Sequence, residues 1–112
     1  MKVLFSFYNP SGGMETLNRI RSKALKERGV ESHLLYKFDG EGRKNIKNIT
    51  TFVTGDAETI REILIRENYD SIIVCSDITM LAQLRNLGYS GKLIFELQAW
   101  DLMRRDCFSR SL

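Results

Sequence analysis

The sequence is poor in the residues that form covalent or metal-held scaffolds. Its 112 residues contain two cysteines, Cys75 and Cys107, and one histidine, His33. Two cysteines in a chain that shows no signal peptide indicate free thiols in a reducing compartment, so we expect a cytoplasmic protein without disulfides. Because the metal-ligating residues do not cluster, neither a structural zinc site nor a catalytic metal is expected.

Long apolar runs and a strong excess of charge are also missing. No run approaches the ~18 apolar residues that a membrane span requires. The net charge is +3, from 17 basic and 14 acidic residues. Because the basic residues are not interleaved with aromatic ones, no nucleic-acid partner is expected. The 43% hydrophobic and 28% charged residues are typical of a globular protein, and the length fits one domain over residues 1–112.

Strand-like and helix-like segments alternate along the chain. The pattern predicts strands over residues 2–8, 30–37, 50–54, 71–75 and 92–97, and helices over residues 14–28, after 56 and after 77. A mobile loop is expected over 38–48, and a partial helix over 99–107. The near-continuous apolarity of residues 2–8 indicates a strand buried on both faces. This order predicts an α/β fold, a Rossmann-like parallel sheet with helices on both faces.

Apolar spacing indicates which face of each helix packs on the sheet. In the first helix, Leu17, Ile20 and Ala24 repeat at helical spacing. The basic residues fall opposite or at the edge of this face, where long side chains can extend into water. Leu25 lies beside the apolar face, Arg19, Lys23 and Lys26 lie opposite it, and Arg21 and Arg28 lie near its edge.

The expected caps of the helices are Asp56, Asp77, Gly29 and Gly88. The apolar face of the second helix is Ile60, Ile63 and Leu64, and that of the third is Ile78, Leu81 and Leu84.

Residues 9–16, Asn-Pro-Ser-Gly-Gly-Met-Glu-Thr, join the first strand to the first helix. A helix N-terminus leaves backbone N–H groups unpaired, and glycine allows a ligand to approach them, so this segment suits an anion or a closely packed sugar. The alternative is that Gly12 and Gly13 only form a tight turn. Ligands of parallel sheets bind beyond the carboxyl ends of the strands, which selects the loops over residues 9–14, 76–79 and 98–100.

Three segments resemble a known family. They are Lys2-Val3-Leu4-Phe5 with Gly12-Gly13-Met14-Glu15-Thr16, Leu25 to Glu31, and Tyr69 to Cys75. Over about residues 1–98 the chain resembles the N-terminal domain of GT-B fold, family 4 retaining glycosyltransferases. Such enzymes transfer a sugar from a nucleotide-sugar donor to a glycan or lipid-linked acceptor, as in polysaccharide biosynthesis, with no active-site metal and no other cofactor.

The resemblance implies roles for particular residues. The N-terminal domain of the family holds the acceptor, and its Gly-Gly loop approaches the donor phosphates, so Gly12, Gly13 and Met14 would line the cleft. Glu15 matches the glutamate of the motif, or it is a first-turn carboxylate that stabilises the helix dipole. No catalytic residue is assigned to this chain.

The chain departs from the family at two places. Where many members carry a histidine after the fifth strand, this chain has Gln98, which either hydrogen-bonds a sugar hydroxyl or ends the strand. Trp100 nearby either stacks on an acceptor sugar or packs against the last helix. The donor-binding C-terminal domain of the family also lies outside these 112 residues. We therefore expect the isolated chain not to turn over, whether it is an isolated domain, a truncated product or one half of a two-chain enzyme.

Other classes of protein remain as alternatives. A dinucleotide-binding domain requires Gly-x-Gly-x-x-Gly and an acidic end to the second strand, and only Gly12-Gly13 is present, with Asp39 late in a loop. A P-loop is excluded because the sequence has no Gly-Lys-Ser/Thr at the end of its glycine segment. A stand-alone Rossmann-like or flavodoxin-like binding module is another alternative. If it were a receiver, Asp77 would accept the phosphate, although the acidic pair that would hold magnesium after the first strand is missing. Finally, the basic first helix either lies on an anionic membrane, as a peripheral contact, or is an ordinary solvated face.

Overall fold

The computed structural model describes residues 1–10 and 12–97, with only the backbone described for residues 12–14. The predicted elements within this part are confirmed with end shifts of a residue or two, and the partial helix over 99–107 lies outside it. The strands are β1 (Lys2–Phe7), β2 (Glu31–Tyr36), β3 (Thr51–Val53), β4 (Ser71–Cys75) and β5 (Lys92–Glu96); the helices are α1 (Gly12–Glu27), α2 (Ala57–Glu67), α3 (Ile78–Asn86) and the short 3₁₀-helix η1 (Glu41–Asn45).

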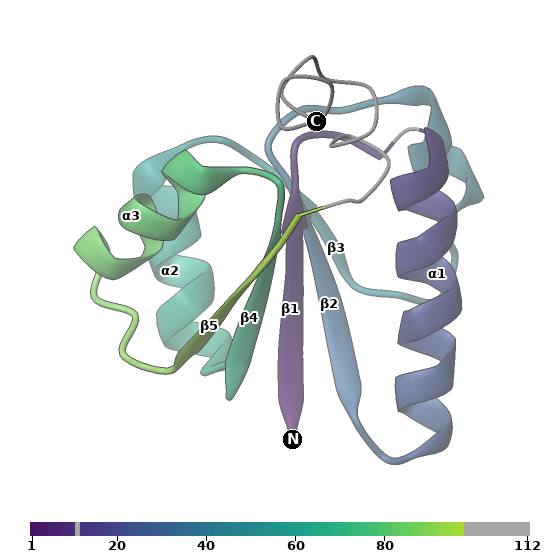
Figure 1. The fold of residues 1–112 in the computed structure, drawn as a ribbon, viewed down its shortest axis with the longest axis horizontal. Helices are drawn as coiled ribbons and strands as arrows, with labels where there is room; N and C mark the ends of the chain where they lie inside the picture. Colours follow the sequence, from purple (N-terminus) through teal and green to yellow (C-terminus); the bar gives the residue numbers. More distant parts are fainter. Residues whose placement is uncertain (11, 98–112) are drawn as a thin grey trace, which may run out of the picture.

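The five strands form one parallel sheet in the order β3-β2-β1-β4-β5 (Figure 1). The first strand lies in the middle, between β2 and β4, and its residues 3–6 are buried. Burial on both faces explains why this strand is almost continuously apolar. The predicted α/β, Rossmann-like class is therefore confirmed.

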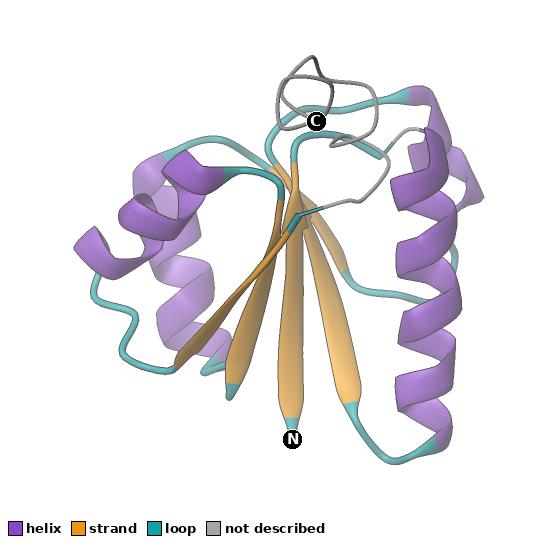
Figure 2. Cartoon of the chain, in the orientation of Figure 1, coloured by secondary structure: helices purple, strands orange, loops and turns teal. Residues whose placement is uncertain are grey.

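Helices cover both faces of the sheet, with α1 on one side and α2 and α3 on the other (Figure 2). Each face has its own hydrophobic core. Leu4, Leu35 and Ile72 lie in the core beneath α2 and α3, whereas Val3 and Leu34 lie in the core on the α1 side. Alternate residues of each strand thus supply the two cores, as the period of a β-strand requires.

The ends of α2 and α3 follow their predicted capping residues. The carboxylate of Asp56 accepts a hydrogen bond from the backbone of Thr59, and that of Asp77 from the backbone of Met80. The apolar face of α2 is buried as predicted, at Ile60, Ile63 and Leu64. In α3 the buried residues are Met80 and Leu84, while Leu81 is partly buried and the predicted Ile78 is exposed because it begins the helix on the side away from the sheet.

The predicted face of α1 is wrong. Leu17 and Ile20 are 41% and 60% exposed, and Ala24 is exposed as well. The buried residues of α1 are instead polar: Glu15, Asn18 and Ser22, followed by the partly buried Leu25. Helical spacing locates an apolar stripe but does not say whether the stripe faces the sheet, and here hydrogen bonds and ion pairs of the inner face compensate its burial.

The segment predicted as a mobile loop contains η1 and packs against the start of α1. A Cβ added to Gly42 would lie 2.9 Å from the Cγ of Glu15 and would also clash with the carbonyl of Pro10. Glycine is therefore required at position 42 for this close approach. Ile46 and Ile49, which follow, pack into the core on the α1 side. As a result η1 forms one wall beside the N-terminal end of α1.

Candidate functional site at the carboxyl edge of the sheet

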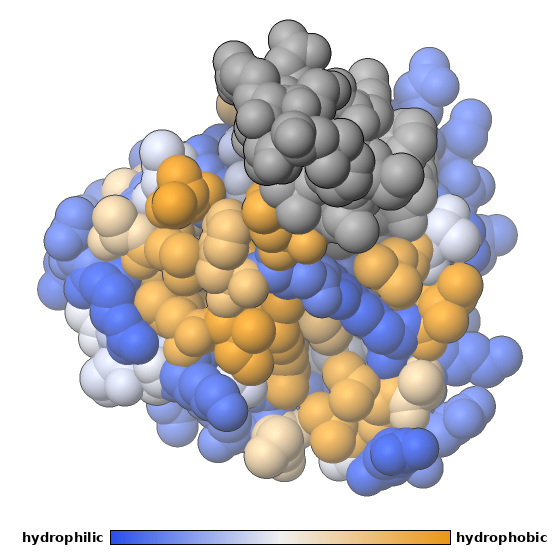
Figure 3. Space-filling view, in the orientation of Figure 1, coloured by the Kyte–Doolittle hydropathy of each residue, from blue (hydrophilic) through white to orange (hydrophobic). Residues whose placement is uncertain are grey.

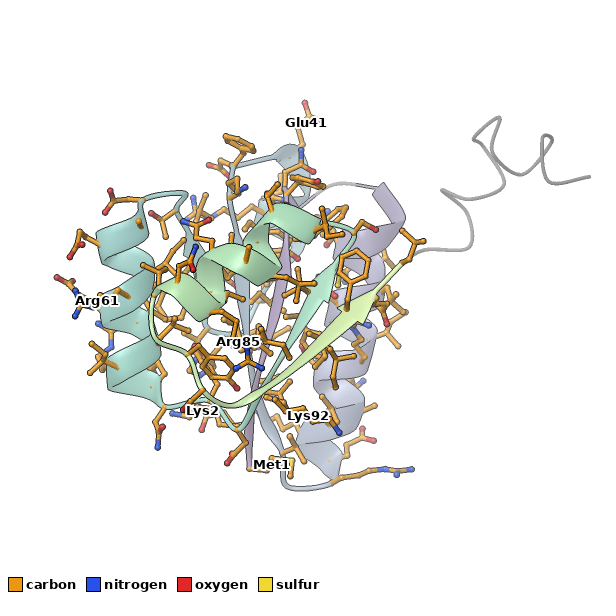
Figure 4. All side chains as sticks on the ribbon, turned by 60° about the vertical axis from the view of Figure 1, so that its left-hand side comes forward. Met1, Lys2, Glu41, Arg61, Arg85 and Lys92 are labelled. Atoms are coloured by element: carbon orange, nitrogen blue, oxygen red, sulfur yellow. The ribbon has the colours of Figure 1, made fainter. Side chains whose placement is uncertain are left out.

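The order in which successive strands are added to the sheet reverses between β1 and β4: β2 and β3 lie on one side of β1, and β4 and β5 lie on the other. After β1 the chain turns to α1 on one face, and after β4 it turns to α3 on the other (Figure 1). Such a switch point opens a crevice at the carboxyl ends of the strands, where open α/β sheets bind ligands. Figure 4 shows Glu41 of η1 at this end of the molecule and Met1, Lys2 and Lys92 at the other.

The glycines of the predicted site lie at this edge. α1 begins at Gly12, two residues after the buried Pro10, so Gly12 and Gly13 form its first two residues. The first N–H groups of a helix have no partner inside the helix. Together with the helix dipole they form a positive end that is directed at the switch point. This backbone can receive an anionic group such as a phosphate.

A buried ion pair joins two strand ends at the same edge. Lys37 follows β2 and Asp77 follows β4, and Nζ of the lysine lies 3.2 Å from Oδ2 of the aspartate. The side chain of Asp77 is only 2% exposed. Its Oδ1 accepts hydrogen bonds from Thr79 Oγ1 and the Met80 backbone, whereas Oδ2 is buried and has no hydrogen bond of good geometry. Lys37 is therefore the main compensation for a charge held in the crevice.

The loops after β1 and β4 meet beside this pair. The ring of Tyr8 lies 5.9 Å from the ammonium of Lys37, and its hydroxyl is 3.5 Å from the carbonyl of Ser76. Ser76 itself adopts a left-handed backbone, with φ of 59°, which is uncommon for a residue with a side chain. Strained backbone of this kind concentrates at functional sites. The half-exposed ring of Tyr8 is a surface on which a sugar or another flat group can stack.

A polar network extends from α1 to the far edge strand. Nη1 of Arg21 donates to both carboxylate oxygens of Glu96 at the end of β5, at 2.9 and 3.0 Å. The same guanidinium donates to Oδ1 of Asn18 and lies 4.1 Å from the ring centroid of Phe5. Asn18 in turn donates to the hydroxyl of Tyr36 at 3.1 Å. These contacts explain how Asn18 and Arg21 can face the sheet, because both side chains have hydrogen-bond partners there.

The thiol of Cys75 lies within this network but is not activated. Its sulfur is 3.2 Å from Nη2 of Arg21 and 3.5 Å from the carboxylate of Glu96. Burial raises the pKa of the thiol to about 11, and the arginine only partly opposes this effect. Burial also raises the pKa of the Tyr36 hydroxyl. Both groups are therefore neutral at physiological pH, and Cys75 is a buried thiol, as predicted, and not a nucleophile.

Some of the predicted site residues lie at the switch point, and others lie outside the described part of the chain. The backbone of Gly12, Gly13 and Met14 begins α1 at the switch point, whereas Gln98 and Trp100 lie outside the described residues. Glu15 is buried, and its carboxylate accepts from Arg19 Nε at 2.6 Å and from Thr16. Its carboxylate is thus held within the first turns of α1, between the helix and η1.

Sequence reasoning missed the charged residues of this edge. It treated Lys37 as the end of a strand and Arg21 as a solvent-directed side chain, and it gave no role to Glu96. The sequence did contain a signal for Lys37. It ends a predicted strand and Asp77 follows another, so both must lie at the same edge of a parallel sheet. For Arg21 and Glu96, which are 75 positions apart, the sequence offers no local signal.

Comparison with known proteins identifies no family. No protein-family model matches this chain, and no curated protein matches it in sequence. Among the described residues, no helix combines the length and apolarity needed to cross a membrane. No group of three or more metal-ligating side chains occurs in residues 1–10 and 12–97.

Proposed function

We propose that this chain is the acceptor-side, N-terminal domain of a family 4, GT-B glycosyltransferase. In this role it would help transfer a sugar from a nucleotide-sugar to a glycan or a lipid-linked acceptor. The observation that carries the proposal is the position of Gly12 and Gly13 at the start of α1, at the switch point of a sheet in the order β3-β2-β1-β4-β5. Backbone N–H groups at such a point suit the phosphates of a nucleotide-sugar.

The acceptor would lie between the loops that follow β1 and β4. Tyr8 supplies a partly exposed ring for a sugar face, and Lys37 supplies a cation beside it. The donor would be held mainly by a second domain, either further along a longer protein or in a partner chain. Ile94, Phe95 and Leu97 at the end of the sheet are each more than a third exposed and form apolar surface for such a contact.

Figure 3 shows this side of the molecule, with apolar surface on both sides of a hydrophilic band. The exposed apolar residues of this part of the fold belong to α1, at Leu17 and Ile20, and to the end of β5. The ion pair of Arg21 and Glu96 spans the same two elements. The apolar end of β5 is suited to a second domain, which would bury it against its own edge.

The alternative classes find less support at this edge. The residue that follows β2 is Lys37, whereas a dinucleotide-binding domain would carry an acidic group there for a ribose. A receiver would need Asp77 as a reachable phosphate acceptor, but its side chain is 2% exposed and is engaged by Lys37 and by the cap of α3. A stand-alone binding module without catalysis remains the alternative, and it would use the same crevice.

The exposed stripe of α1 supports a peripheral membrane contact, at the inner face of the membrane if the protein is cytoplasmic. Leu17 and Ile20 point outward, and the exposed Lys23 and the partly exposed Arg19 lie close to them along the helix. An apolar stripe with flanking cations is the pattern of helices that lie on anionic lipid. A lipid-linked acceptor would then be presented at the same membrane.

The donor role is tested by NMR titration of the 112-residue protein with pyrophosphate and with uridine diphosphate. We expect the backbone amides of residues 12–14 to shift in a saturable manner, with millimolar affinity because the second domain is missing. The proposal fails if the shifts spread over surface lysines with no preference for residues 12–14, or if Gly13→Ala leaves them unchanged.

The enzymatic role requires the protein as it occurs in its source cell. Material captured with an antibody against this chain would be incubated with labelled nucleotide-sugars, and transfer to lipid or glycan would be measured. We expect transfer by the captured material and none by the isolated 112 residues. Captured material that transfers no sugar from any nucleotide-sugar would favour the binding-module alternative.

The membrane contact is tested by sedimentation with vesicles of phosphatidylcholine, with and without phosphatidylglycerol. We expect binding only to the anionic vesicles, and we expect Ile20→Glu to abolish it. Ile65→Glu on α2 is the matched control, since Ile65 is also strongly exposed but lies on the other face of the sheet. Binding that does not depend on anionic lipid, or that Ile65→Glu removes equally, would rule the contact out.

A further inference from the structure

A second groove lies along α1, away from the switch point. It has a volume of about 910 Å³ and lies between the C-terminal half of α1 and residues 45–50, with the start of β2 also contributing to its lining. Figure 1 shows the chain passing behind α1 before it reaches β3. Ser22, near the middle of the groove, is ten residues after Gly12, which corresponds to ~15 Å along a helix. The groove is therefore separate from the glycine site.

Three lysines that have no ion-pair partner in the described part of the chain line this groove. Arg19, Lys23, Lys26 and Lys47 are basic, against two acidic residues, Glu27 and Glu31. Arg19 is paired with Glu15, and Glu31 with His33 and Lys2. Among the described residues the three lysines have no carboxylate within ion-pair distance. The groove therefore holds positive charge that the chain itself does not neutralise, which attracts anions.

A buried hydroxyl in the same groove has no partner. Ser22 is 3% exposed, and its Oγ forms no hydrogen bond in the structure. A buried polar atom without a partner is costly, and a serine hydroxyl can both donate and accept. Because Ser22 lines the groove, a small shift of its side chain would let a ligand with its own hydroxyl or phosphate oxygen pair with this atom and remove the cost. Ser22 is thus an independent observation that points to a ligand at this position.

The remaining lining fits a ligand with a polar body. Asn45, Asn48 and Thr50 line the wall opposite α1, and Ser32 lies on β2. Asn48 adopts a left-handed backbone, with φ of 63°. The volume is much larger than one phosphate needs and falls in the range of small-molecule sites. Lysines bind phosphate as point charges, without requiring the paired geometry of arginine.

We propose that this groove is a binding site for a phosphorylated sugar or another phosphate that carries hydroxyl groups. The lysines bind the phosphate, and Ser22 and the amides opposite it bind the hydroxyls. The site does not depend on the proposed glycosyltransferase role, because it uses neither the glycines nor the crevice. A soluble sugar phosphate and the headgroup of a phosphoinositide share this chemistry.

The test is NMR titration with glucose 1-phosphate, with neutral glucose as the comparison. We expect saturable shifts of the amides of residues 22–26 and 45–50 with the phosphate and none with glucose. The double variant Lys23→Gln/Lys26→Gln should weaken binding about tenfold, on the basis of roughly threefold for each exposed ion pair. Ser22→Ala should weaken it severalfold while the protein stays folded, because that variant removes a hydroxyl that has no partner.

Arg61→Gln is the matched control. Arg61 is exposed on α2, on the far side of the sheet, and Figure 4 shows it directed away from the molecule. Its loss removes one positive charge, as Lys23→Gln alone does, and should change the affinity less than twofold, against roughly threefold for Lys23→Gln. Equal effects of Arg61→Gln and the double lysine variant would overturn the proposal, because attraction by net charge alone would then explain the binding. Shifts confined to residues 12–14 would assign the phosphate to the switch point and would also overturn it.

A second experiment, with vesicles, distinguishes a soluble sugar phosphate from a phosphoinositide headgroup as the ligand. Vesicles that contain a phosphoinositide are sedimented with the protein, and Ile20→Glu separates the groove from the apolar stripe of α1. Binding that survives Ile20→Glu but is lost in the double lysine variant supports the groove with a lipid headgroup as ligand. Binding of glucose 1-phosphate alone supports it with a soluble ligand. No binding in either arm refutes the site.

Discussion

Arg21 in the middle of α1 holds Glu96 at the end of β5 through two hydrogen bonds, at 2.9 and 3.0 Å. Between these residues lie β1 and β4, because β5 is the edge strand on the side away from β2. The arginine therefore reaches past the central strand and ties α1 to the half of the sheet that this helix does not cover. This contact fixes the geometry of the crevice edge.

Loss of this contact should destabilise the fold. We expect Arg21→Met to lower the free energy of unfolding by about 1–3 kcal/mol, mainly because Oδ1 of the buried Asn18 then lacks its donor, while the half-exposed Glu96 contributes less. Urea denaturation measures the change. The control is Arg66→Met, whose pair with Glu67 is exposed and should matter by less than ~0.5 kcal/mol. Equal effects of the two substitutions would show that the network contributes nothing.

The pair of Lys37 and Asp77 should show strong coupling. Lys37→Met leaves Oδ2 of Asp77 buried without a counter-charge and should cost about 2 kcal/mol. Asp77→Asn keeps an acceptor for the cap of α3 and removes the charge. In the double variant the cost should therefore be smaller than the sum of the single costs, by about 1–2 kcal/mol in a double-mutant cycle. Additive costs would mean that the two charges do not stabilise each other.

The exposed stripe of α1 gives a direct test of the fold. We expect Ile20→Ala to change the free energy of unfolding by less than ~0.5 kcal/mol, since its side chain faces solvent. Ile60→Ala on α2, which is fully buried, should cost about 2–5 kcal/mol. A cost at Ile20 close to that at Ile60 would show that α1 packs with its apolar side on the sheet, as its sequence pattern predicts.

The thiol of Cys75 should make stability depend on alkaline pH. Its pKa is about 11 in the folded protein, against about 8.5 in an unfolded chain. Because the raised pKa favours the protonated form, its contribution to stability is complete below about pH 8.5 and is lost as the pH rises to about 11. In a Cys107→Ser background, the free energy of unfolding should fall between pH 8.5 and 11 more steeply than in the same background with Cys75→Ala.

Thiol labelling checks the same group in another way. In the Cys107→Ser background, a thiol reagent should label Cys75 very slowly at pH 8 and rapidly once urea unfolds the protein. Fast labelling of the folded protein at pH 8 would contradict the burial of Cys75 and the raised pKa.

Local patterns in the sequence were sufficient for most of the fold. Asp56 and Asp77 identified the starts of two helices, the spacing of Ile60, Ile63 and Leu64 identified the buried face of α2, and the apolar run of β1 indicated a strand buried on both faces. These signals are short in range, since a cap acts over three residues and a buried face repeats every turn. The alternation of strands and helices then led to the parallel sheet, and with it to the edge where Gly12 and Gly13 lie.

Only the tertiary structure decided how α1 is oriented and which charges meet at the crevice. The apolar stripe of α1 has normal helical spacing, yet Asn18 and Arg21 are the residues that face the sheet. Tyr36 and Glu96 on the strands supply their hydrogen-bond partners. Spacing along one helix carries no information about hydrogen-bond partners on strands 18 and 75 positions away. A polar helix face can be buried only when such partners exist, and their positions depend on the order of strands in the sheet.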